Sequence, residues 1–124
     1  KPESKIDDTL KITNEGVEKA IESTKPGNTC HDVAMSFWGV LEKYGLEKES
    51  RCGYSIGLGY PPDWGEHTLS IRKNEMTTLH PNVTYHLMAG MWMDTWGLEI
   101  SESIRVTENG CELFCNFPRR LHII

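Results

Sequence analysis

The segment Gly53–His67 concentrates the side chains that are most suited to chemistry. It reads GYSIGLGYPPDWGEH and combines four glycines and two adjacent prolines with two tyrosines, a tryptophan, two acids and a histidine. Glycines permit positive φ angles or a close approach of the backbone to a bound group, and a proline pair stiffens a turn. Aromatic rings beside acid and imidazole groups can line a pocket for a small polar molecule. The segment therefore indicates a ligand site; the alternative is a structured surface loop whose aromatic rings pack on the domain.

Two helices are expected before this segment. Apolar residues at helical spacing predict a first helix over residues 13–25, which a Pro-Gly pair ends. Asn28 or Thr29 can cap a second helix, and Asp32 stands three residues after Thr29, as in a capping box. Gly45 suits the position just beyond the end of that helix, because glycine adopts the left-handed conformation required there.

After the second helix the periodicity changes to the alternation that is typical of strands. Strand patterns cover Tyr54–Leu58, His67–Ile71, Thr84–Met93, Trp96–Thr107 and Cys111–Cys115. Helices first and strands afterwards predict an α+β domain, in which helices cover one face of an antiparallel sheet.

Alternation along two of these strands gathers polar groups on one face. His86 and Met88 share a face of one strand, and Glu99 and Ser101 share a face of the next. If the two strands are neighbours, these side chains meet beneath the aromatic segment; the alternative is a solvated sheet face. Glu102 falls on the apolar side, where it needs a partner or an edge position.

Composition narrows the classes of partner. The chain has 124 residues, a net charge of −5 and a pI near 5.5, which fits one domain or part of one. An acidic chain with few adjacent basic pairs is not expected to bind nucleic acid or an anionic membrane. No apolar run is long enough to span a bilayer and no secretory signal is visible. Four irregularly spaced cysteines do not form a disulfide scaffold, so we expect free thiols in the cytoplasm.

Five motifs follow one another along the chain in a recognisable order. They are Lys25–Gly27, Gly53–Glu66, Thr78–Pro81, Trp96–Ile104 and Val106–Gly110. This order resembles the C-terminal half of the creatinase/aminopeptidase, or pita-bread, fold, and the resemblance covers nearly all of the chain from about Glu15 onward. Within that superfamily, the chain looks most similar to the ectoine hydrolases, which open the cyclic amidine of ectoine to an acetylated diaminobutyrate.

The resemblance implies a partial pita-bread fold. Two N-terminal helices should pack on a mainly antiparallel curved sheet. Residues 1–124 would then be the C-terminal portion of the catalytic domain, without the N-terminal domain and without the first half of the catalytic domain. We expect such a fragment to be inactive by itself.

The resemblance also predicts which metal ligands are missing. Metallopeptidases of this fold hold two metal ions with two Asp, one His and two Glu. Tyr54 stands at the position of the His, and Met88 and Ser101 stand at the positions of the two Glu; the Asp pair belongs to the other half of the fold. A phenol, a thioether and a hydroxyl cannot replace these ligands around hard divalent ions. We therefore expect no metal and no other cofactor, as in the metal-free branch of the superfamily.

Without metal, hydrolysis of a C–N bond needs a carboxylate or histidine that activates water or attacks, and a donor to the leaving nitrogen. By the resemblance, the main catalytic glutamate lies upstream, and this chain supplies the other wall of the site. A phenol can donate a hydrogen bond, indole rings can stack on a flat amidinium, and carboxylates can pair with it. Each histidine could instead have a structural role. The candidate catalytic residues are His67, His86 and Glu66, and the candidate substrate-binding residues are Tyr54, Trp64, Glu99 and Trp96.

Three functions remain open from the sequence. The first is a metal-independent hydrolase of a small cyclic amidine or related C–N bond, with the compatible solute ectoine as the leading substrate. The second is a metallopeptidase of the Xaa-Pro class, which the lost ligands disfavour. The third is a non-catalytic binding module of the same fold. For each of these, exposed strand edges favour a homodimer.

Overall fold

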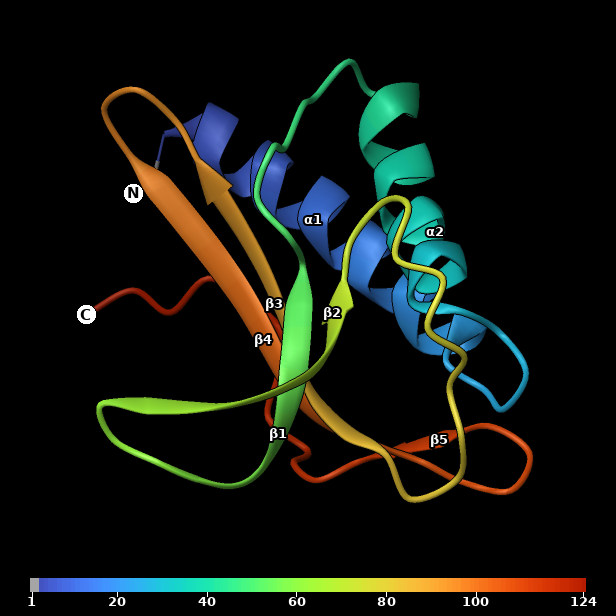
Figure 1. Ribbon diagram of the computed structural model, residues 1–124. Coiled ribbons are helices and arrows are strands. Elements are labelled where there is room, and N and C mark those ends of the chain that lie inside the picture. The colour runs from blue at the N-terminus through green and yellow to red at the C-terminus, as the bar shows by residue number, and fades with distance from the viewer. Residues whose placement is uncertain (1–2) are drawn as a thin grey trace.

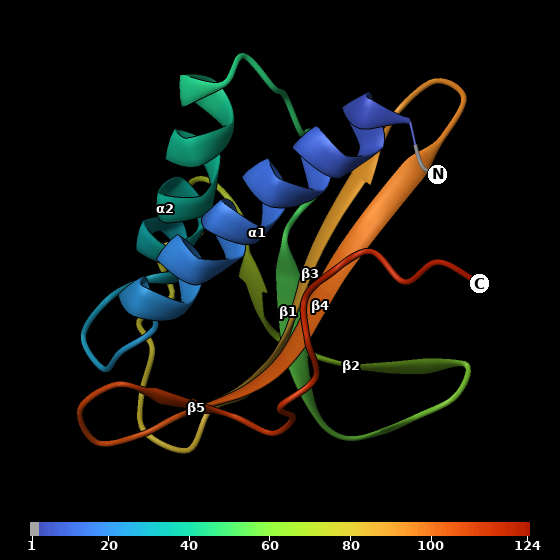
Figure 2. The same cartoon turned by 180° about the vertical axis from the view of Figure 1, so that it is seen from behind.

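Two helices precede a five-stranded sheet in the computed structural model, which describes residues 3–124 apart from Trp64. Every strand pair is antiparallel, in the order β2-β1-β3-β4-β5. Both helices lie on one side of the sheet, and the longer strands bend along their length (Figures 1 and 2). The expected α+β architecture is confirmed. The elements are α1 (Ser4–Ser23), α2 (Cys30–Lys43), β1 (Gly53–Tyr60), β2 (Asp63–Ile71), β3 (Thr84–Trp92), β4 (Gly97–Val106) and β5 (Cys111–Leu113).

Helix α1 begins nine residues before the predicted start at residue 13, so that prediction was wrong. The first turns are mostly polar, although Ile6 and Leu10 stand four residues apart and continue the spacing of Val17. Asp7 and Lys11 form an i,i+4 ion pair with a 2.7 Å N–O distance. Leu10 is buried and lines a hollow with residues of the C-terminal segment. The polar residues around Ile6 and Leu10 obscured their helical spacing, and the C-terminal segment, being far away in sequence, gave no local signal. Neither of the two described helices is both long and apolar enough to cross a membrane.

Helix α2 begins and ends as predicted. The backbone N–H of Asp32 donates to Thr29 Oγ1 at 3.1 Å, and the Thr29 N–H donates to Asp32 Oδ2 at 2.8 Å. These two bonds form the capping box. At the other end Gly45 has φ of 68°, and the Leu46 N–H donates to the carbonyl of Leu41 at 2.9 Å. This is a Schellman arrangement, which satisfies carbonyl groups left free at the end of a helix.

The core lies between the helices and the sheet face that they cover. Val17 of α1, Phe37 of α2 and Leu87 of β3 are fully buried in one cluster. Tyr85 is also fully buried, and its phenolic oxygen lies 2.5 Å from Thr24 Oγ1. This contact satisfies a polar group that would be costly to bury alone.

The helix contact depends on a glycine. A Cβ atom added at Gly16 of α1 would lie 2.8 Å from the Phe37 ring. We therefore expect Gly16→Ala to lower the free energy of unfolding by about 1–3 kcal/mol, because the added methyl group would overpack the contact between the helices. Gly39 of α2 is the matched control, since its added Cβ meets nothing within 4 Å. Gly39→Ala should raise stability by about 0.5–1 kcal/mol through helix propensity. Urea unfolding of the two variants checks this, and equal effects would contradict it.

The Gly53–His67 segment is a β-hairpin rather than a loop between two short strands. β1 continues to Tyr60, β2 begins at Asp63, and the two adjacent prolines form the turn. The far end of the hairpin projects from the sheet away from the helices (Figure 1). The pairing shifts along the hairpin: Tyr54 pairs with Ser70, whereas Ile56 pairs with Gly65. β2 therefore carries extra residues in a bulge. Because the bulge interrupts the alternation of side chains, the full length of the two strands could not be predicted from the sequence.

Candidate functional site

The sheet face opposite the helices gathers the predicted polar residues. In β3, His86 lies between Tyr54 of β1 and Ser103 of β4. Two residues further on, Met88 lies opposite Ser101. Because directly paired residues share a face, these five side chains belong to one surface. The predicted condition that the two strands are neighbours is confirmed.

Tyr54 and His86 are in direct contact. The Tyr54 hydroxyl lies 2.9 Å from His86 Nδ1, and the two rings meet edge to face with their centroids 5.2 Å apart. The guanidinium of Arg51 lies 4.9 Å from the centre of the Tyr54 ring, a cation–π distance. Burial lowers the pKa of His86 below its ordinary value of 6.5, and the negative charge of Glu99 partly opposes this. The imidazole is therefore mainly neutral near pH 7 and can exchange a proton with the phenol.

His86 should make stability dependent on pH. Its pKa is lower in the folded chain than the ordinary 6.5, so the unfolded chain binds the proton first on acidification. The contribution is complete above about pH 6.5 and is lost as the pH falls through 6.5 toward the folded-state pKa. Urea unfolding between pH 8 and pH 5 should show this loss, and His86→Gln should remove part of the slope. Exposed His80 supplies the control substitution, His80→Gln. Equal slopes in the parent chain, His86→Gln and His80→Gln would contradict the prediction.

A second acid–base pair stands next to Tyr54. Asp63 Oδ2 lies 2.6 Å from His67 Nε2. The pKa of Asp63 is lowered, first by the hydrogen bond from the backbone N–H of Gly65 and then by the bond to His67. Both residues line a cavity of about 250 Å³ with Arg51, Tyr54, Gly65, Leu69 and Met88. Asp63 was not predicted as a site residue, because residues four apart in a regular strand do not touch.

Glu66, another hairpin candidate, does not line this cavity. Glu66 Oε1 accepts a hydrogen bond from the backbone N–H of Gly59, so this carboxylate bridges the two strands of the hairpin. Trp64 lies outside the described residues.

Two tryptophans, the candidate Trp96 and Trp92, lie near the connection between β3 and β4. Trp96 lies in the connection between β3 and β4, with Lys5 Nζ 5.9 Å from its ring centre. That connection begins beyond Trp92, which is itself about 20 Å from His86 along the strand at roughly 3.3 Å per residue. Trp92 shares the face of His86 by alternation and is 62% exposed. Added Cβ atoms at Gly90 and Gly97 would lie 2.5 and 2.9 Å from its ring, so the indole lies flat over two glycines. Continuing the alternation from Met88 would have identified it.

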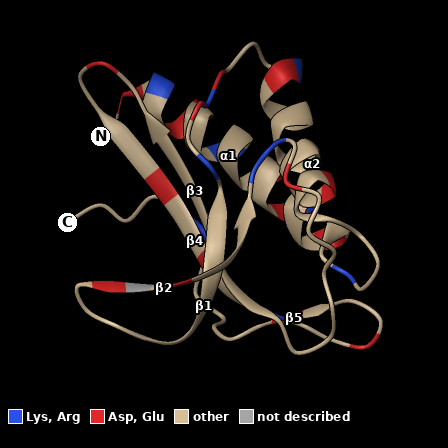
Figure 3. Ribbon diagram, viewed as in Figure 1, with Lys and Arg blue, Asp and Glu red and all other residues tan. Residues whose placement is uncertain are grey.

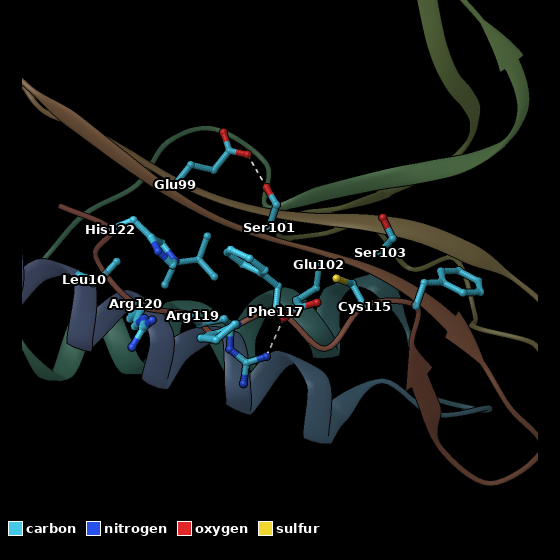
Figure 4. A pocket seen from close by; sticks show the side chains of 13 residues that line it. Leu10, Glu99, Ser101, Glu102, Ser103, Cys115, Phe117, Arg119, Arg120 and His122 are labelled. Carbon is cyan, nitrogen blue, oxygen red and sulfur yellow. Dashed lines mark hydrogen bonds and ion pairs between the residues drawn. The ribbon is translucent and has the colours of Figure 1, made fainter. Parts of the chain in front are cut away.

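Glu99 and Ser101 lie at the other side of the open face. The Ser101 hydroxyl donates to Glu99 Oε1, and both residues line a hollow of about 360 Å³ between β4 and the C-terminal segment, residues 114–124. Figure 4 shows Glu99, Ser101 and Ser103 on one side of β4 and Glu102 on the other, next to Arg119. Arg119 Nη1 donates to Glu102 Oε1 at 2.8 Å. The predicted partner of Glu102 is therefore a residue of the C-terminal segment.

The donor set of this face does not fit the divalent metal ions that metallopeptidases of the pita-bread fold hold. Tyr54, Met88 and Ser101 offer a phenol, a thioether and a hydroxyl, whereas hard divalent ions prefer carboxylates and imidazole. Within residues 3–124, no three His, Cys, Asp or Glu side chains come together in a way that could hold a metal. The acidic residues are dispersed over the helices, the hairpin and β4 (Figure 3).

The chain is similar in sequence to a known protein family and to individual curated proteins. Residues 1–108 match the family model of metallopeptidase family M24. Ectoine hydrolase of Halomonas elongata is 50% identical over 110 residues, which cover 88% of this chain and 28% of that protein. A hydrolase/peptidase of Sinorhizobium fredii, y4tL, is 48% identical over 110 residues, or 88% of this chain and 27% of that protein. The chain thus spans less than a third of the length of these curated relatives.

Solved structures have the same fold at low identity. The Xaa-Pro dipeptidase of Bacillus anthracis superimposes with a TM-score of 0.90 at 21% identity, over 100% of this chain and 34% of that chain. The X-Pro aminopeptidase of Thermotoga maritima gives a TM-score of 0.89 at 22% identity, over 100% and 35% respectively. The expected resemblance to pita-bread proteins of the creatinase/aminopeptidase superfamily, and to ectoine hydrolase, is confirmed, as is a partial pita-bread fold.

Proposed function

Because this chain belongs to metallopeptidase family M24, we propose that it forms one wall of the active site of a hydrolase that needs no metal and opens a small cyclic amidine such as ectoine. The observation that carries the proposal is the open sheet face. Tyr54, Met88 and Ser101 share it, and Tyr54 contacts His86 at 2.9 Å. Identity of 50% to an ectoine hydrolase supports the choice of substrate.

The proposed chemistry is the addition of water to the amidine carbon. The bond from that carbon to one ring nitrogen then breaks, and this nitrogen must gain a proton as it leaves. The hydroxyl of Tyr54, in contact with neutral His86, is placed to donate a hydrogen bond to it. His67 is a second proton-transfer group at the same cavity. The carboxylate that starts the reaction is expected from another part of the catalytic domain.

Recognition of the amidinium requires negative charge and flat aromatic surface. Glu99 supplies a carboxylate on the same face as His86. Exposed Trp92 lies one alternation beyond Gly90, the residue that pairs with Glu99. A planar cation stacked on the indole would therefore lie close to this carboxylate. Gly90 is four residues from His86, about 13 Å along β3. Trp92 and Glu99 would therefore form an outer binding position, separate from the one at which Tyr54 donates to the amidine.

Two alternative functions, an Xaa-Pro peptidase and a non-catalytic binding module, are distinguished from this proposal by the chimera experiment described below. An Xaa-Pro peptidase has the same fold, as the solved structures demonstrate, but its chemistry needs metal ligands that this face lacks. A binding module would take up the amidine without opening it.

The proposal extends to the location and assembly of the protein. All four cysteines are free thiols, which fits the reducing cytoplasm. β5 pairs with the last three residues of β4, and the Phe114 N–H donates to the Ser103 carbonyl. Among the described residues, 97–102 of β4 therefore lack a strand partner on this side and form an edge that a second copy can use. Light scattering during size-exclusion chromatography should detect a homodimer. A monomer at every concentration up to the millimolar range would contradict this part.

A chimera tests the function. This chain would replace the matching 110 residues of Halomonas elongata ectoine hydrolase, and NMR would follow ring opening of ectoine. We expect turnover that is unchanged by EDTA and no hydrolysis of Xaa-Pro dipeptides. A folded chimera that binds ectoine without opening it, or that works only with added Mn²⁺, would contradict the proposal.

A further inference from the structure

We propose that Asp63 is a positioning residue that holds neutral His67 as the Nε2–H tautomer and leaves Nδ1 free to accept a proton. The tautomer follows from geometry alone, whereas its use in catalysis rests on the proposed function.

The carboxylate of Asp63 has both oxygens engaged. Oδ1 accepts a hydrogen bond from the backbone N–H of Gly65 at 3.0 Å, and Oδ2 lies 2.6 Å from His67 Nε2. The pKa of Asp63 is lowered by these two contacts, the first being the stronger cause. An ionised carboxylate can only accept hydrogen bonds, so the nitrogen that faces it must carry the hydrogen.

The contact exists because the backbone departs from a regular strand. Residues four apart in a strand are separated by about 13 Å, yet Asp63 and His67 touch. Between Gly65 and Ser70, β2 accommodates the bulge, and His67 adopts φ of 56°. This left-handed conformation is strained for a residue other than glycine.

A serine on the neighbouring strand stabilises the bulge. Ser55 is buried, and its Oγ accepts hydrogen bonds from the backbone N–H groups of Thr68 and Leu69 at 3.2 and 3.4 Å. These are the two residues that follow His67. The strained position of His67 is therefore anchored from β1, next to Tyr54, and is a built feature of the fold.

The dyad faces the cavity that Tyr54 lines. Arg51 is the other charged group among the described residues that line this cavity, and its charge also lowers the pKa of Asp63. Glu66 turns away toward Gly59. In the reaction, Nδ1 would take the proton released when water adds to the amidine carbon, and ionised Asp63 would stabilise the resulting imidazolium.

Nitrogen-15 NMR of the histidine side chains in this chain, at a pH where they are neutral, tests the tautomer without substrate. We expect Nε2–H in the parent chain. In Asp63→Asn the amide oxygen can keep the bond from Gly65, so the NH₂ group must donate to Nε2 and force the Nδ1–H tautomer. Asp94→Asn is the control, because Asp94 is exposed in the β3–β4 connection, and it should leave His67 unchanged.

The same tautomer in the parent chain and in Asp63→Asn would overturn the proposal. The catalytic part is read in the chimera, where Asp63→Asn should lower kcat roughly tenfold to a hundredfold and change KM little. Since the tautomer is measured without ectoine, failure of the proposed substrate would not be confused with failure of the dyad.

Discussion

Replacing Arg119 with methionine is expected to lower the free energy of unfolding by about 2–4 kcal/mol. The side chain of Glu102 is only 5% exposed, and Arg119 Nη1 donates to it at 2.8 Å. Without this cation the carboxylate would be buried with no partner charge. The estimate is at the lower end of the range for buried pairs because Arg119 itself is 23% exposed.

Arg119 also attaches the C-terminal segment to α1. Its Nε donates to Asn14 Oδ1 at 2.8 Å, and its Nη2 lies 3.6 Å from Glu18 Oε1. Loss of these contacts should release the segment that borders the hollow next to Glu99. Arg119→Met should therefore also increase amide hydrogen exchange along β4.

Urea unfolding measures the effect of Arg119→Met. Arg120→Met is the matched control, since Arg120 is the exposed neighbour and its replacement should change stability by less than about 0.5 kcal/mol. The double variant Arg119→Met, Glu102→Leu should recover most of the loss, because an apolar pair can replace a buried ion pair. Equal effects of the two single arginine variants would show that Glu102 does not depend on Arg119.

The second large effect is expected for Tyr54→Phe in the chimera. The proposal gives the Tyr54 hydroxyl the role of donor to the leaving nitrogen, and general acid catalysis of this kind contributes about 10²–10⁴-fold. The variant removes only the hydroxyl, so the edge-to-face contact with His86 and the stacking of Arg51 should persist. We therefore expect kcat to fall by about 100-fold, with little change in KM.

Steady-state rates of ectoine ring opening check this prediction. Tyr44→Phe is the control: the Tyr44 hydroxyl donates to Glu15 at 2.8 Å, a contact between the helices and not on the open sheet face. A Tyr54→Phe chimera with unchanged kcat would remove the phenol from the mechanism and leave His86 with a structural role.

Local signals predicted much of the fold. The Thr29–Asp32 capping box and the glycine after α2 are satisfied within a few residues of the chain, so the ends of that helix could be read directly. Strand alternation placed Glu99 and Ser101 on one face and Glu102 on the other, and the pairing of β3 with β4 confirms it.

Features that depend on distant contacts could not be predicted in the same way. The burial of Leu10 is one of them, because Leu10 lines a hollow with residues of β4 and of the C-terminal segment, although its spacing from Ile6 and Val17 fits a helix. The need of Glu102 for a partner was evident, but nothing in its neighbourhood identified Arg119.

The candidate site was predicted in part. Tyr54 and His86 were both proposed, and their contact required the register of two strands. Asp63 was missed, because only the bulge in β2 brings it to His67. The hairpin and the flat placement of Trp92 on two glycines likewise follow from pairing between strands.

Thermal unfolding of this chain, titrated separately with ectoine and with Mn²⁺, tests most directly whether the open face is an amidine site that needs no metal. Ectoine at about a hundred times its dissociation constant should add on the order of 2.7 kcal/mol of stability, and Mn²⁺ should add nothing that EDTA reverses. Stabilisation by Mn²⁺ that EDTA reverses, without any response to ectoine, would contradict the account and return the chain to the metal-dependent members of its family.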